Sequence, residues 1–265
     1  SLATWWYKLA RGRAVKEMAM AEKETKIFLR NPALLTQLIM LAAITVLYMY
    51  NLSVLPLAEV TTIFSHLPAL ITYLNIAFIA FIISALAVRF VYPSVSLEGK
   101  AFWIIQTAPV SMTELILSKF LVYFFPLLLM AGLLSVMATK ILHSGMFFAV
   151  LSLVDSIFLT ALITAINIGV GAVYPHFEAK NAIEIPLSFG GLLTMVLSLA
   201  GICLLMLLQS FSIYRVVRYG ADLFSIGPAM PVAKLVLFFL SFILCLLCTW
   251  GVLLWGIIRL RSYAQ

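Results

Sequence analysis

The stretch "FFAVLSLVDSIFLTALITAINIGVGA", residues 147–172, contains a single charged residue, Asp155. About 20 consecutive apolar residues are enough for a helix to cross the hydrocarbon core of a bilayer. The stretch therefore predicts a membrane-spanning helix near the middle of the chain. Five further apolar runs of spanning length lie at residues 33–52, 69–91, 118–139, 187–209 and 235–258.

The composition agrees with this pattern over the whole chain. Hydrophobic residues make up 64% of the 265 residues, and charged residues only 10%. The mean hydropathy of +1.14 lies far from the values of soluble proteins. The predicted fold class is an all-α integral membrane protein with six transmembrane helices, formed by residues 32–265, with no room for a separate soluble domain.

The basic residues predict the orientation of these helices, because cytoplasmic loops are enriched in Lys and Arg. With both termini in the cytoplasm, all Lys and Arg residues face that side except Lys140, Arg215, Arg218 and Lys234. The net charge of +7 then describes a basic inner face toward anionic lipid, not a nucleic-acid surface. We expect a multi-pass protein of the cell membrane.

Residues 1–31 predict an interfacial amphipathic helix before the first span. Lys16, Lys23 and Arg30 recur every seven residues on one arc, and a separate arc is apolar. The simpler alternative is a basic topology signal without a further role.

The loop at residues 92–116 joins the second and third spans, and it is polar for this chain, with Glu98, Lys100 and Glu114. Within it, Phe102 and Trp103 point away from an apolar helical stripe, which suits a pocket on another protein. The alternative is that both rings anchor the loop at the membrane interface. Ser111 and Glu114 have the spacing of a capping box, which predicts the start of the third membrane helix.

The search for catalytic motifs finds none of the usual devices. The sequence has no H-E-x-x-H metal site, no G-x-S-x-G nucleophile elbow and no G-x-x-x-x-G-K-[ST] phosphate loop. Cys245 and Cys248 form a C-x-x-C pair inside an apolar run, which is a weak metal signal without further ligands. From this pattern we expect neither an enzyme nor a directly bound metal or cofactor.

Three patches of the sequence resemble ABC-2 type transporter permeases, in particular the transmembrane subunits of a group of ABC exporters. They are Glu98–Lys119, Gly171–Glu178 and Ser188–Leu192, with Lys16–Pro32 as a further similarity. The resemblance implies a permease subunit that moves substrate outward by alternating access. Its implied partners are a homodimer mate or second permease half, membrane lipid, and a separate P-loop ATPase subunit that holds ATP and magnesium on the cytoplasmic face.

In that family the first cytoplasmic loop is the coupling helix. The resemblance therefore implies that the loop contacts the ATPase through Glu98, Gly99, Lys100, Phe102, Trp103 and Gln106. Some members of the group are longer than this chain, which is accordingly interpreted as a fragment, a processed product or one half of a longer permease.

Polar residues inside the predicted spans are candidates for a translocation path, namely Asn75, Asp155 and Asn167. The alternatives are interhelical hydrogen bonding for the two Asn residues and a solvated position near the outer headgroups for Asp155. Gly169 and Gly171 predict a close approach of two helices. Residues 210–231 predict a re-entrant or interfacial segment.

Two other functions remain open from the sequence. One is an ion-coupled secondary transporter that uses Asp155 or Glu59, although no convincing inverted repeat is found. The other is a membrane assembly factor that does not transport.

Overall fold

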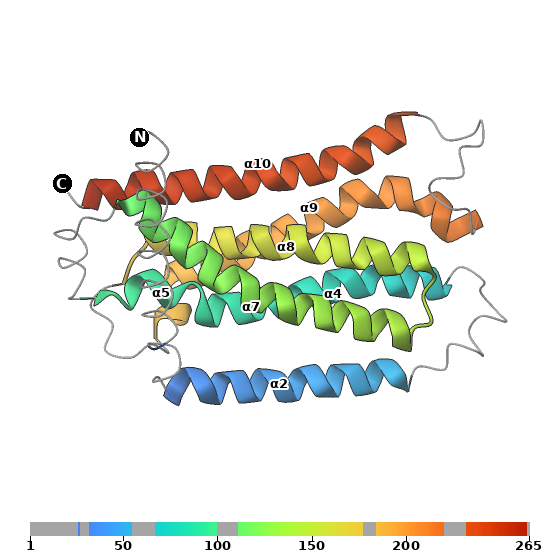
Figure 1. Ribbon diagram of the computed structural model, residues 1–265, viewed down its shortest axis with the longest axis horizontal. Helices are drawn as coiled ribbons and strands as arrows, with labels where there is room; N and C mark the ends of the chain where they lie inside the picture. Colours follow the sequence, from blue (N-terminus) through green and yellow to red (C-terminus); the bar gives the residue numbers. More distant parts are fainter. Residues whose placement is uncertain are drawn as a thin grey trace, which may run out of the picture.

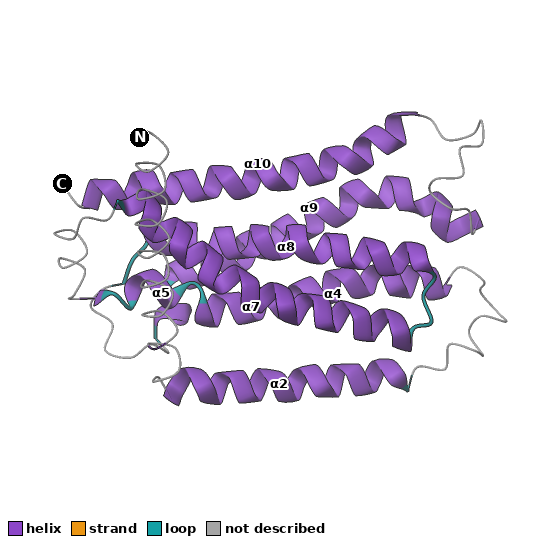
Figure 2. Cartoon of the chain, viewed as in Figure 1, coloured by secondary structure: helices purple, strands orange, loops and turns teal. Residues whose placement is uncertain are grey.

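The computed structural model describes residue 26 and residues 32–54, 67–99, 111–176, 184–219 and 232–263. Within these ranges the backbone is helix and loop, and none of it is strand (Figure 2). The all-α class is therefore confirmed. The helices are α2 (Pro32–Ser53), α4 (Leu67–Phe90), α5 (Pro93–Ser96), α7 (Met112–Ile141), α8 (Met146–Val173), the 3-10 helix η2 (Ile185–Leu187), α9 (Phe189–Tyr219) and α10 (Val232–Tyr263).

Five segments of the described chain are long and apolar enough to cross a membrane. They are Leu70–Ser96, Met112–Ile141, Met146–Val173, Phe189–Ser210 and Val236–Ser262. The predicted first span coincides with α2, a helix of 22 residues without a charged side chain, but α2 is not among these five. The structure thus provides five candidate spans where the sequence predicts six.

The long helices run side by side along the longest axis of the molecule (Figure 1). Helix α8 lies at the centre, where it packs against α4, α7, α9 and α10. Helix α2 lies at one side and contacts α4 and α7. Its Tyr48 ring stacks on Phe78 of α4 with a centroid distance of 4.4 Å, and the Tyr48 hydroxyl donates to Asn75 Oδ1.

The central position of α8 follows from its sequence. All residues from 162 to 173 are buried, because apart from Thr164 and Asn167 this half of the helix consists of apolar residues and glycine. A helix that is hydrophobic all round is expected to be covered by other helices on all sides. In its other half, the Ser152 and Ser156 hydroxyls hydrogen-bond with Ser135 of α7, which ties the two helices together.

Small residues allow α8 and α10 to approach closely. A Cβ atom added at Gly256 would lie 2.9 Å from the Cα of Gly169, and one added at Gly169 would lie 2.6 Å from the Val252 side chain. These separations are below ordinary van der Waals contact. The close approach expected at Gly169 is confirmed, and the helix that approaches is α10.

Helix α9 corrects one prediction. It continues to Tyr219, and Ile213 within it is buried, so residues 210–219 extend a membrane-length helix instead of forming a re-entrant segment. Residues 220–231 lie outside the described residues. No Gly or Pro interrupts residues 202–219, so the helix continues through Ser210 without a break.

The contact between α8 and α10 gives a first testable prediction. Gly256→Leu should lower the free energy of unfolding by about 1–3 kcal/mol, because a larger side chain forces the two helices apart. Unfolding of the purified protein, followed by circular dichroism during titration with denaturing detergent, measures the change.

Gly251→Leu on the same helix is the matched control, since nothing lies within 4 Å of a Cβ at Gly251. Equal stability of the two variants would contradict the packing assigned to Gly256.

Candidate functional site

A group of buried polar residues lies at one end of the bundle, where α4 ends and α7 begins. We call this the Tyr92 end. Segments that are far apart in the sequence meet there: α5, the start of α7, the end of α8 and η2 (Figure 1). The end of α10 also reaches it, since Arg261 Nη2 donates a hydrogen bond of 2.9 Å to Thr113 Oγ1.

The first component is an ion pair between Glu98 and Lys119. The Lys119 Nζ atom lies 2.9 Å from Glu98 Oε1, and the side chains are only 1% and 4% exposed for Lys119 and Glu98. The same Nζ donates a hydrogen bond of 2.9 Å to the carbonyl oxygen of Ser94. Buried charges are stable only when they are paired in this way, so the pair fixes α7 against the segment around α5.

The start of α7 positions Lys119. Ser111 Oγ accepts a hydrogen bond of 3.2 Å from Glu114 N, and Glu114 Oε2 accepts one of 2.9 Å from Ser111 N. This is the capping box that the sequence predicts, and it is confirmed. Because the cap fixes where the helix begins, it fixes which face of α7 carries Lys119 about two turns later.

The second component is Tyr92, whose side chain is fully buried. Its hydroxyl lies 3.0 Å from Ser188 Oγ and donates to the Tyr174 carbonyl oxygen at 3.4 Å. Nearby, Ser96 Oγ accepts a hydrogen bond of 3.0 Å from His176 N. The two similar runs Val91–Pro93 and Val173–Pro175 therefore meet across the Tyr92 end.

Glycines make room for the Tyr92 side chain and backbone. A Cβ added at Gly171 would lie 2.8 Å from the Tyr92 carbonyl oxygen, and one at Gly190 would overlap the Tyr92 hydroxyl. Any other residue at these positions would displace the ring or its backbone. The glycines at 171 and 190 therefore explain how the end of α8 and the start of α9 both contact Tyr92.

Of the six predicted coupling residues, the structure describes Glu98 and Gly99. Glu98, which the resemblance implies contacts an ATPase, is buried in the ion pair. Gly99 follows it in a left-handed backbone conformation, with a φ of 49°, which glycine adopts without strain. The other four predicted positions, and the predicted interfacial residues, lie outside the described residues: Lys100, Phe102, Trp103 and Gln106; Lys16, Lys23 and Arg30.

The three candidate path residues have separate hydrogen-bond partners. Asn75 accepts from Tyr48, and Asn167 Nδ2 donates to the Ile163 carbonyl oxygen of its own helix at 2.8 Å. Asp155 is fully buried and accepts a hydrogen bond of 2.8 Å from Gln209 Nε2. The alternative of a solvated Asp155 is therefore wrong.

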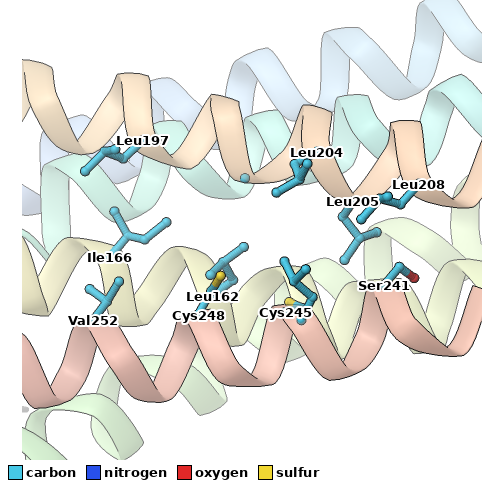
Figure 3. A pocket seen from close by; sticks show the side chains of 12 residues that line it. Leu162, Ile166, Leu197, Leu204, Leu205, Leu208, Ser241, Cys245, Cys248 and Val252 are labelled. Carbon is cyan, nitrogen blue, oxygen red and sulfur yellow. The ribbon is translucent and has the colours of Figure 1, made fainter. Parts of the chain in front are cut away.

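A cavity of about 170 Å³ lies between α8, α9 and α10 (Figure 3). Its wall is almost entirely apolar, and none of Asn75, Asp155 and Asn167 lines it. Cys245 and Cys248 face it beside Leu162 and Leu204, as free thiols. In the described part of the chain, no group of three or more His, Cys, Asp and Glu side chains could hold a metal ion.

Sequence reasoning missed the two residues at the centre of the site. Lys119 was placed on the cytoplasmic side by its charge, and Tyr92 was given no role. A signal for Lys119 was present, because it lies inside the predicted span 118–139, where a charged side chain needs either a partner or a path to the interface. Its partner could not be read locally, because Glu98 belongs to a different segment.

The ion pair gives a prediction about stability. Glu98→Gln and Lys119→Met should each lower the free energy of unfolding by about 3–5 kcal/mol, because each leaves one buried charge without its partner. The double variant should be destabilised by much less than the sum of the two. Denaturant titrations of the four proteins form a double-mutant cycle, and additive losses would contradict the pairing.

The contact between Gly190 and Tyr92 gives a second prediction. Gly190→Ala should lower the midpoint of thermal unfolding, because its methyl group overlaps the Tyr92 hydroxyl. Tyr92→Phe removes that oxygen and should partly restore the midpoint when both changes are combined. If the double variant melts below both single variants, the contact is not the cause.

The comparison with protein families gives one match. The family model described as "Putative ATP-binding cassette" matches residues 8–264, a range that includes every helix named above. Neither the search of curated proteins nor the search of solved structures gave a match to the chain.

This match corrects the assignment made from the sequence. Its description names an ATP-binding cassette and not a permease, which contradicts both the predicted exporter permease subunit and the ion-coupled alternative. The match also contradicts two further predictions, namely that the chain is not an enzyme and that it depends on a separate P-loop ATPase. The reason is that the description applies to this chain's own family. The sequence nevertheless has no G-x-x-x-x-G-K-[ST] run. The chain belongs to the family described as "Putative ATP-binding cassette".

Proposed function

We propose that this protein is a multi-pass membrane protein that acts in ATP-binding cassette transport, with its helical bundle embedded in the bilayer. One observation carries the proposal. The family match over residues 8–264 contains five helices that are long and apolar enough to cross a membrane. The part of the chain that belongs to the family is thus largely the part suited to the membrane.

The proposal includes α2 as a sixth span. Its 22 residues contain no charge and are long enough for the hydrocarbon core. The large apolar side chains on its surface, such as Ile39, Val46 and Leu47, are 60–69% exposed, as expected for side chains that face lipid.

The proposal also includes an orientation, with the Tyr92 end in the cytoplasm of a cell-membrane protein. At this end lie Arg89, Lys119, Arg259 and Arg261, whereas Lys140 lies at the other end of α7. Cytoplasmic ends of membrane helices are enriched in basic residues.

Within this proposal, an ATP-driven change would enter the bundle at the Tyr92 end. The Glu98–Lys119 ion pair joins the α5 segment to α7, and Tyr92 joins it to η2 and the end of α8. A movement of the α5 segment would therefore be passed to helices on both sides of it. Gly99, Lys100, Phe102, Trp103 and Gln106, which follow in the sequence, remain predicted parts of the same element.

Two cysteine variants test the orientation and the response to ATP together. Leu187→Cys marks the Tyr92 end and Met146→Cys the opposite end, at side chains that are 82% and 80% exposed. Both are made in a chain whose Cys203, Cys245 and Cys248 are replaced by Ala. A membrane-impermeant maleimide should label Leu187→Cys in inside-out vesicles and Met146→Cys in intact cells, and the reverse result would overturn the orientation.

The response to ATP is measured in the same inside-out vesicles and in the purified chain in nanodiscs. MgATP should change the labelling rate of Leu187→Cys, whereas MgADP should not. The Glu98→Gln/Lys119→Met double variant should weaken the change, and Lys140→Met should leave it as it is. If MgATP changes the labelling in neither preparation, the proposed role in ATP-binding cassette transport is wrong.

A further inference from the structure

A buried carboxyl group lies in the half of the bundle away from the Tyr92 end. Asp155 of α8 and Gln209 of α9 are both 0% exposed, and they are hydrogen-bonded to each other. Tyr73 of α4 bonds to the carbonyl oxygen of Met206, about one turn from Gln209, and Cys245 of α10 bonds to that of Phe158, about one turn from Asp155. Four helices therefore contribute side chains to this region.

If Asp155 is ionised, this group has more buried hydrogen-bond acceptors than donors. Gln209 Nε2 donates to Asp155 Oδ1, but Asp155 Oδ2 and Gln209 Oε1 are both buried acceptors without a donor. Each of these two oxygens has less than 1 Å² of accessible surface, so a water molecule cannot reach either. An unpaired buried acceptor costs about 1–3 kcal/mol, and a charged one costs more.

The neighbouring donors are already used elsewhere. The Tyr73 hydroxyl donates to the Met206 carbonyl oxygen at 2.5 Å, and Cys245 Sγ donates to the Phe158 carbonyl oxygen at 3.3 Å. Among the described residues, no Lys, Arg or His forms an ion pair with Asp155. An ionised carboxylate would thus be an isolated charge inside the bundle, which is a costly arrangement at membrane depth.

We propose that Asp155 holds a proton and forms a cyclic acid–amide pair with Gln209. In this pair the Asp155 Oδ2 hydroxyl donates to Gln209 Oε1, while Gln209 Nε2 donates to Asp155 Oδ1. One proton satisfies both orphaned oxygens and removes the charge. The ligand of this site is therefore a proton, and the bound proton joins α8 to α9. This inference depends only on the buried geometry, not on the proposed role in ATP-binding cassette transport.

Infrared spectroscopy of the full chain in lipid tests the proposal directly. A protonated carboxylic acid has a carbonyl stretching band that an ionised carboxylate lacks, and the band shifts in D₂O. The wild-type protein should show such a band at neutral pH, and Asp155→Asn should remove it. Glu98→Gln is the control for a buried acid in an ion pair, and it should leave the band unchanged.

Stability measurements distinguish the pair from a purely steric role. Asparagine has the same shape as protonated aspartic acid and places one N–H donor and one acceptor where the pair needs them, and its second N–H is additional. Asp155→Asn should therefore unfold at a denaturant concentration closer to that of the wild type than Asp155→Ala, which loses both hydrogen bonds. Absence of the band from the wild-type protein, or its persistence in Asp155→Asn, would overturn the proposal. So would a loss of stability in Asp155→Asn equal to that in Asp155→Ala.

Discussion

Polar groups inside this bundle can bind only to other parts of the same bundle, and this constraint governs much of its structure. In hydrocarbon, an unsatisfied polar group costs several kcal/mol because no water is available to replace the missing partner. Lys119, Tyr92 and Asp155 each meet the constraint with a partner from another segment of the chain. Apolar contacts alone would allow helices to slide or rotate, whereas these polar pairs specify which helices are neighbours and in what register.

The sequence predicts the local features of the fold well. Apolar runs locate the long helices, and the Ser111–Glu114 capping box locates the first turn of α7, because both signals depend on residues close together in the chain. The end of α9 was harder to predict. Its residues beyond Ser210 include polar and charged side chains, which suggested a re-entrant or interfacial segment, yet α9 continues through them to Tyr219.

The candidate site could be predicted only in part, for a related reason. Glu98 was singled out as a coupling residue implied by the family resemblance, but its burial was not predicted. Its pairing with Lys119 depends on how the chain turns through α5, which no local pattern reports. The same applies to Asp155, whose solvation was judged from its distance to the helix end, while Gln209 covers it from another helix. The short sequence similarities pointed to a permease family, whereas the family match over nearly the whole chain has a different description.

The central position of α8 has a consequence for biosynthesis. Helices leave the ribosome in chain order, so α8 is made before α9 and α10, which cover two of its sides. During that interval Asp155 lacks Gln209, and the surface at Gly169 lacks the helix that packs on it. The newly made chain must therefore pass through an unfinished stage in which the helix that carries Asp155 is covered on only some of its sides. Translation of the last third of the protein completes the assembly, and any pause in that third prolongs this exposure.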